Sequence, residues 1–137
     1  MEPSEEVVTV IRDWFGSIVR AENSWRDRHV SQHQDLRIIG TDPGEWLNGD
    51  PAFAFLRTEA DAAGGKVQIE VNDLEGFREG SVGWGCARPT ITLPDGSKVT
   101  PRWSAVFHQE DGGWKVVQLH ASVGAGNRET FGDVLPE

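Results

Sequence analysis

The sequence predicts an α+β fold, in which helices come first and an antiparallel meander of strands follows. Apolar residues recur every three or four positions in the first half of the chain, and every second position from Lys66 onward. A chain of 137 residues is long enough to bury one hydrophobic core. We therefore expect a single domain over residues 1–137, with the helices covering one face of a curved sheet.

Three helices are expected in the first half of the chain. Residues 3–23 carry apolar side chains at helical spacing, with Ser4 as the N-cap. These apolar residues are Val7, Val10, Ile11, Trp14, Phe15, Ile18 and Val19. A short second helix is expected within 24–33. The third helix is expected over 50–65, with Asp50 at its cap and two glycines at its end.

Most of the strands are expected after the helices. One short strand is expected earlier, at 36–40, where it leads into a loop. Period-two alternation predicts four further strands, at 66–77, 81–93, 98–110 and 114–123. Turn sequences such as PDG and EDGG separate some of them, which is typical of hairpins. Strands that follow one another in sequence are therefore expected to pair antiparallel.

The composition argues against several kinds of partner. The 22 acidic and 13 basic residues give a formal net charge of −9, which disfavours nucleic acid and anionic membrane surfaces as partners. No apolar run approaches the roughly 20 residues of a membrane span. The acidic N-terminus is unlike a signal peptide, and the single cysteine, Cys86, cannot form an internal disulfide. We therefore expect a cytoplasmic protein.

The stretch IIGTDPGEWLNG, residues 38–49, allows two interpretations of Asp42. Asp-Pro-Gly is turn chemistry, in which Pro43 sets φ and the Asp42 side chain accepts hydrogen bonds from nearby backbone N–H groups. Trp46 follows at once, however, and a turn has no need of a tryptophan. A carboxylate next to Trp46 would be partly desolvated and suited to general acid–base chemistry. Both roles stay open from the residues alone.

The order of the elements, the loop IGTDPGEWLNG and the ending GGWKVVQLHASVGAGN resemble the nuclear transport factor 2-like superfamily. Within it they are similar to the SnoaL-like and ketosteroid isomerase-like branch, over residues 5–127. The resemblance implies a cone-shaped curved antiparallel sheet that wraps around the N-terminal helices and encloses an apolar pocket. Members include isomerases, cyclases, dehydratases and proteins that only bind or assemble, so the resemblance implies a fold more firmly than an activity.

The resemblance also implies roles for single residues. Ketosteroid isomerase-like members carry a general-base Asp in an Asp-Pro pair after the first strand, and Asp42 occupies that place. Their oxyanion donors are missing, because Phe15 stands in place of a tyrosine and Ala105 or Trp103 in place of a second Asp. Limonene epoxide hydrolase-like members need an Arg-x-Asp pair, and this strand reads RWS. Steroid-type enolisation and epoxide hydrolysis are therefore not expected.

Strand alternation indicates which side chains line the pocket. In 81–93 either phase is possible, and the bulkier one points Trp84, Cys86 and Arg88 inward, which makes Arg88 the candidate cation beside the candidate base Asp42. The apolar residues expected to contact a ligand are Trp14, Phe15, Trp46, Phe55, Trp84, Trp103, Phe107 and Leu119. Core packing would account for the same aromatic residues, but six tryptophans in one small domain favour a ligand pocket.

The other face of the sheet is expected to contact a second copy of the chain. Alternation in the last strand predicts an outward set of side chains with polar and aromatic members. This set comprises Trp114, Val116, Gln118, His120 and Ser122. In the superfamily this face often packs against another subunit, so the resemblance implies a homodimer in which His120 is structural.

Two classes of function follow. The first is a cofactor-independent isomerase, cyclase or dehydratase for a hydrophobic or aromatic substrate, in which Asp42 moves a proton and Arg88 stabilises negative charge. The second is a non-catalytic ligand-binding or assembly module, in which Asp42 only forms a turn. No cofactor or metal is expected, because Cys86 has no nearby ligand partner and His29 and His33 lack a third.

Overall fold

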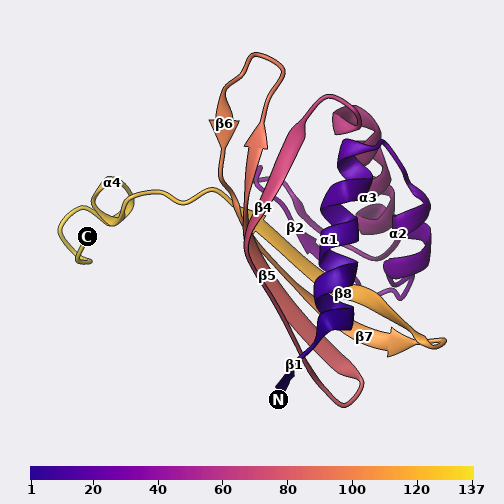
Figure 1. Cartoon of the computed structure of the whole chain (residues 1–137). Helices are drawn as coiled ribbons and strands as arrows, with labels where there is room; N and C mark the ends of the chain where they lie inside the picture. The colour runs from indigo at the N-terminus through magenta and orange to yellow at the C-terminus, as the bar shows by residue number, and fades with distance from the viewer.

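The computed structural model describes every residue from 1 to 137, and it confirms the α+β class. Three helices lie together on one face of a curved, open sheet: α1 (Glu5–Val19), α2 (Ser24–His29) and α3 (Gly49–Ala63) (Figure 1). The main strands are β4 (Gln68–Glu79), β5 (Val82–Thr92), β7 (Arg102–Glu110) and β8 (Gly113–Ser122). The short strands are β1 (Glu2–Pro3), β2 (Arg37–Ile39), β3 (Trp46–Asn48) and β6 (Lys98–Val99).

The sheet is mixed rather than antiparallel throughout, which corrects the prediction. Its strands are ordered β1-β4-β5-β7-β8-β2-β3, and β6 pairs with β5. Strands β4, β5, β7 and β8 form the expected meander, but β2 runs parallel to β8, with Ile38 opposite Leu119. No hairpin joins β2 to β8, so their direction is not constrained by a tight turn. The predicted loop after β2 is the turn of a β2–β3 hairpin, which places Ile39 opposite Trp46.

Helix α1 supplies the apolar side chains that pack against the sheet. Ser4 accepts a hydrogen bond from the Val7 N–H at 3.2 Å, as expected of an N-cap. Val7 and Ile11 are fully buried. The Nε1 atom of Trp25 donates to the Val10 carbonyl at 3.0 Å, which attaches α2 to α1. The helical spacing of the sequence thus identified the buried face of α1 correctly.

Helix α3 begins earlier than predicted. Asn48 is its N-cap and Asp50 lies in its first turn, so the prediction of Asp50 as the cap is wrong. Between them Gly49 has φ of +63°, and its N–H donates to the Leu36 carbonyl at 2.9 Å. Glycine adopts this left-handed conformation without steric cost, so the chain turns from β3 directly into the helix there.

The inward orientation predicted for Trp84, Cys86 and Arg88 is wrong. Cys86 and Arg88 are exposed and Trp84 is half-buried, while the residues between them, Gly85 and Ala87, are buried on the helix side. A Cβ atom added at Gly85 would lie 2.4 Å from the Cδ1 atom of Ile11. At Gly83 and Gly85 helix α1 therefore lies too close to β5 for a side chain on that face, and the bulky Trp84 occupies the other face.

The outward orientation predicted for Trp114 and Val116 is also wrong, because both are buried at 4% exposure or less. A β-bulge shifts the register of β7 against β8 after Val106 and leaves Val117 without a partner. The extra residue reverses the alternation along β8, so apolar residues on both sides of the bulge face the helices. Beyond the bulge the alternation holds, and His120 is exposed as predicted.

The chain after β8 leaves the body of the domain (Figure 1). It contains a short helix, α4 (Asn127–Phe131), that the sequence did not predict. Arg128 closes this segment on itself. Its Nε atom lies 2.6 Å from Glu137 Oε1 and its Nη1 atom lies 2.9 Å from Asp133 Oδ1.

Candidate functional site

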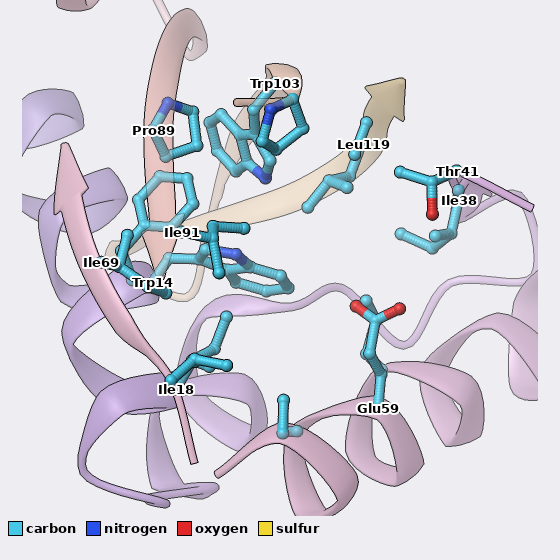
Figure 2. Close-up of a pocket in the computed structure, with 18 of the residues that line it drawn as sticks. Trp14, Ile18, Ile38, Thr41, Glu59, Ile69, Pro89, Ile91, Trp103 and Leu119 are labelled. Atoms are coloured by element: carbon cyan, nitrogen blue, oxygen red, sulfur yellow. The ribbon is translucent and has the colours of Figure 1, made fainter. Parts of the chain in front are cut away.

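A cavity of about 280 Å³ lies between the helices and the sheet (Figure 2). Side chains of α1 and α3 line one side of it, and side chains of β4, β5, β7 and β8 line the other. Fifteen of its 21 lining residues are hydrophobic, so the cavity suits a mostly apolar molecule. These hydrophobic residues include Ile18, Ile38, Leu56, Ile69 and Ile91.

Five of the eight predicted ligand contacts line this cavity. They are Trp14, Phe15, Phe55, Trp103 and Leu119. The Trp103 ring lies 5.3 Å from that of Phe15 and 6.2 Å from that of Trp14, measured between ring centroids. These aromatic residues form one continuous wall, because the regular spacing in α1 and β7 directs all three inward. Their contact with a ligand stays a prediction.

The other three predicted contacts lie elsewhere. Phe107 is fully buried in the core and does not reach the cavity. Trp84 lies on the other face of the sheet, where its ring stacks on Phe77 at 6.2 Å. Trp46 is 65% exposed on β3, with the Arg37 guanidinium 5.5 Å from its ring centroid.

Asp42 forms a turn outside the cavity. Its Oδ1 atom accepts a hydrogen bond from the Gly44 N–H at 3.0 Å, and its own N–H donates to Glu45 Oε1 at 3.1 Å. The residue is exposed, and of its neighbours Gly40 and Thr41 line the cavity while Asp42 does not. This geometry favours the turn-forming role over the catalytic role, which stays a prediction.

Arg88 is also distant from the cavity. Its Nη2 atom lies 2.7 Å from Asp73 Oδ2, and its Nε atom donates to the same oxygen at 2.8 Å. Both side chains are more than half exposed on the outer face of the sheet. An exposed ion pair of this kind contributes little to stability and does not place a positive charge near an enclosed ligand.

Glu59 of α3 is a cavity residue that the sequence analysis missed. The residue lies at the exposed rim, but its carboxylate points into the cavity toward Ile38 and Thr41 (Figure 2). No ion pair within 4.0 Å holds this carboxylate. Desolvation raises the pKa of Glu59, and the Glu45 carboxylate raises it further, while Arg26 opposes the change. A carboxyl group with these properties can act as a general acid or base.

Arg26 of α2 is the second missed residue, and it is the only cation among the residues that line the cavity. It is 1% exposed. Its Nη1 atom donates to the Glu22 carbonyl at 2.9 Å and to Asn23 Oδ1 at 3.4 Å, and its guanidinium lies 5.1 Å from the Trp14 ring centroid. Its Nε atom is buried and has no hydrogen-bond partner.

The positive charge of Arg26 is stabilised by nearby acidic residues, although none of them forms a direct ion pair with it. Desolvation lowers the pKa of Arg26, and the carboxylates of Glu59, Asp61 and Asp27 oppose that change. An arginine keeps its proton at neutral pH even when buried, so the cavity contains a positive charge. Such a charge with an unused donor is costly to bury and attracts an oxygen acceptor.

One of these two residues carried a signal in the sequence. Glu59 lies four residues after Phe55 and three after Leu56, so it belongs to the apolar face of α3. A charged residue at such a position is unexpected for a helix that only packs. Arg26 carried no comparable signal, because α2 has six residues and is too short to show a period.

The chain contains no group of three or more His, Cys, Asp or Glu residues arranged to hold a metal ion. None of its helices combines the length and the apolar character needed to cross a bilayer.

Comparison with known families gives one match. Residues 7–126 match the sequence profile of the SnoaL-like domain. No curated protein is similar enough in sequence to match the chain.

Several solved structures share the fold at low sequence identity. An NTF2-like protein of unknown function from Pseudomonas putida aligns with a TM-score of 0.74 and 13% identity, covering 93% of this chain and 92% of its own. A candidate ketosteroid isomerase from Shewanella frigidimarina has a TM-score of 0.69 and 13% identity over 87% and 96%. The association domain of CaMKII from C. elegans has a TM-score of 0.70 and 16% identity over 87% and 94%. At these identities the likeness shows the fold alone.

Proposed function

Because this chain belongs to the SnoaL-like domain family, we propose that its cavity binds a mostly apolar small molecule and that Glu59 transfers a proton on it. The reaction class is that expected from the sequence, a cofactor-independent isomerisation, cyclisation or dehydration. The roles suggested there for Asp42 and Arg88 pass to Glu59 and Arg26, which line the cavity.

One observation supports this proposal above the others. The Glu59 carboxylate points from the exposed rim into an apolar cavity without an ion-pair partner, and desolvation raises its pKa. A carboxylate whose pKa lies closer to neutral is a stronger base when ionised and remains able to return the proton. Structural carboxylates usually have a partner or lie in solvent, so an unpaired one directed into a cavity indicates function.

The chemistry proceeds in two proton transfers. The Glu59 carboxylate removes a proton from a carbon atom next to a carbonyl group, and the electron pair of the broken C–H bond moves onto the carbonyl oxygen. The protonated Glu59 then returns the proton to another carbon, which gives an isomer, or to a leaving hydroxyl group, which gives water and a double bond. The positive charge of Arg26 favours the negative charge that develops on the substrate.

Deuterium exchange tests this role without a known substrate. Cyclohexanone, 1-indanone and 2-tetralone are incubated with the protein in D₂O, and the loss of the proton signals next to the carbonyl group is followed by NMR. We expect the protein to accelerate exchange in at least one ketone. Glu59→Gln, which keeps the size but removes the base, should slow this exchange by about 100-fold or more.

Asp42→Asn is the matched control, since asparagine forms the same turn but is not a base. It should exchange ketone protons at the wild-type rate. A loss of exchange in Asp42→Asn but not in Glu59→Gln would assign the catalysis to Asp42. Absence of exchange with every ketone would favour a function in binding alone.

A second candidate function, as an assembly module, is supported by the outer face of the sheet. Trp84 is half-buried in the single chain and borders a hollow with Cys86, Gln118 and His120. An aromatic residue beside a hollow is a typical anchor for a partner subunit. One protein of the same fold is an association domain. We propose that two copies of this chain pair through this face, with the cavity of each left accessible.

A further inference from the structure

The Nε atom of Arg26 is the only buried side-chain nitrogen or oxygen of the chain without a hydrogen-bond partner. Arg26 is only 1% exposed, and it lines the apolar cavity. Burial of an unpaired donor on a charged group costs free energy, so folded proteins rarely retain one without a reason. The Nη2 atom of Arg26 also makes no hydrogen bond or ion pair within the chain, because only Nη1 is engaged, so this nitrogen is left for a molecule in the cavity.

We infer that the ligand of the cavity carries a carboxylate on an apolar ring, and that the carboxylate binds Arg26 while the ring contacts Trp103 and Leu119. This inference rests on the proposed small-molecule function and names its substrate class. A guanidinium recognises a carboxylate with charge-assisted hydrogen bonds, which are shorter and stronger than neutral ones. The rest of the cavity wall is mostly apolar, so it suits the ring of the ligand, and Arg26 is the one cation that can bind the carboxylate.

The acidic residues near Arg26 decide how the carboxylate is accommodated. Glu59 and Asp61 approach from α3, and Asp27 lies on the same helix as Arg26. Glu59 is the one of these that lines the cavity, and its own charge is already disfavoured by burial and by Glu45. In the fraction of molecules in which Glu59 holds a proton, its hydroxyl group donates to the ligand carboxylate instead of repelling it. The ionised fraction still supplies the base that the proposed proton transfer needs.

Binding is therefore linked to protonation of Glu59. A ligand carboxylate cancels the effect of Arg26, which is the group that opposes the rise in the pKa of Glu59. The pKa of Glu59 then rises further on binding, and the complex takes up a proton. Affinity for a carboxylate should fall as pH rises through the pKa of Glu59, while affinity for a neutral ligand should change less.

The test compares two transparent ligands of the same shape, cyclohexanecarboxylate and cyclohexanecarboxamide. Dissociation constants are measured with the whole chain by calorimetry and by the fluorescence of the cavity tryptophans. We expect the carboxylate to bind about tenfold to 100-fold more tightly than the amide. The preference should shrink at higher pH, and calorimetry in buffers of different ionisation enthalpy should show proton uptake with the carboxylate.

Arg26→Met removes the charge but keeps an unbranched side chain of similar length. It should abolish the preference for the carboxylate and leave amide binding within about twofold. Arg57→Met is the matched control, because Arg57 is an exposed arginine that pairs with Asp27 at 3.4 Å and does not line the cavity. It should retain the full preference.

Other results would overturn either the inference alone or the inference together with the proposed pocket function. Equal affinity for the two ligands in the wild type, or an unchanged preference in Arg26→Met, would overturn the inference and leave the proposed function standing. Failure of both ligands to bind at millimolar concentration would overturn the inference and the proposed pocket function together. If Arg26→Met does not fold, the arginine Nε–H signals of ¹⁵N-labelled wild-type protein decide, because the carboxylate should shift one of them and the amide should not.

Discussion

Arg26 and Glu59 lie on different helices and line the same cavity, where the charge of each opposes the effect of burial on the other. Burial disfavours both charged forms, because an apolar cavity solvates ions poorly. The two groups are not joined by an ion pair within 4.0 Å. Each therefore retains hydrogen-bonding capacity that a bound molecule can use.

Glu59 should make the stability of the protein depend on pH in a specific direction. The pKa of Glu59 is raised in the folded state. At pH values between the ordinary pKa of about 4.3 and this raised pKa, Glu59 is protonated in the folded chain and ionised in the unfolded chain. Stability therefore falls as pH rises from the ordinary pKa through the raised pKa. Glu59→Gln does not titrate, so its stability relative to the wild type should increase across this window.

Urea unfolding at a series of pH values, followed by tryptophan fluorescence, measures this difference. Thr58→Ser is the control, since Thr58 is an exposed residue of α3 without an ionisable side chain. The free energy difference between Thr58→Ser and the wild type should stay constant over the same pH range. If the free energy of unfolding of Glu59→Gln changes with pH in the same way as that of the wild type, the raised pKa of Glu59 is contradicted.

Trp103 should be costly to truncate, because it is a buried tryptophan of the cavity wall. It is 5% exposed and packs against Trp14 and Phe15. Trp103→Ala should lower the free energy of unfolding by about 3 to 5 kcal/mol and weaken binding of an apolar ligand. Trp46→Ala, at a residue 65% exposed, should cost less than about 0.5 kcal/mol. Similar losses in both variants would contradict the described orientation of the two side chains.

Gly85→Ala tests the close approach of α1 to β5. The added Cβ atom would lie 2.4 Å from Ile11 Cδ1 and 2.5 Å from the Glu75 carbonyl oxygen, and backbone cannot move aside as a side chain can. We expect a loss of about 1 to 3 kcal/mol in urea unfolding. Gly113→Ala, where a Cβ atom has open space, should be nearly neutral. A neutral Gly85→Ala would show that α1 lies farther from the strand.

The proposed dimer predicts a particle of about 30 kDa in light scattering, twice the 15.1 kDa of the chain. Trp84→Glu places a charge at the centre of the proposed interface and should produce a monomer. Trp46→Glu changes another tryptophan, on β3, and should leave the dimer intact. A monomeric wild-type chain at micromolar concentration would remove the proposed interface.

Local patterns in the sequence determined the class of the fold and the order of its elements. The helical spacing from Val7 to Phe15 identified the buried face of α1, and period-two alternation identified the four long strands. Trp14, Phe15, Phe55, Trp103 and Leu119 line the cavity, and their contact with a ligand stays a prediction. Such patterns succeed because burial of one face repeats with the geometry of the element itself.

Contacts between distant segments decided what the sequence could not. The phase of β5 depends on how closely Ile11 approaches Gly85, and the phase of β8 depends on one unpaired residue, Val117. The polar part of the cavity wall forms only because α2 and α3 bring Arg26 and Glu59 to the same cavity. Strand phase and the desolvation of a charge are properties of the neighbours that folding supplies, so no local pattern encodes them.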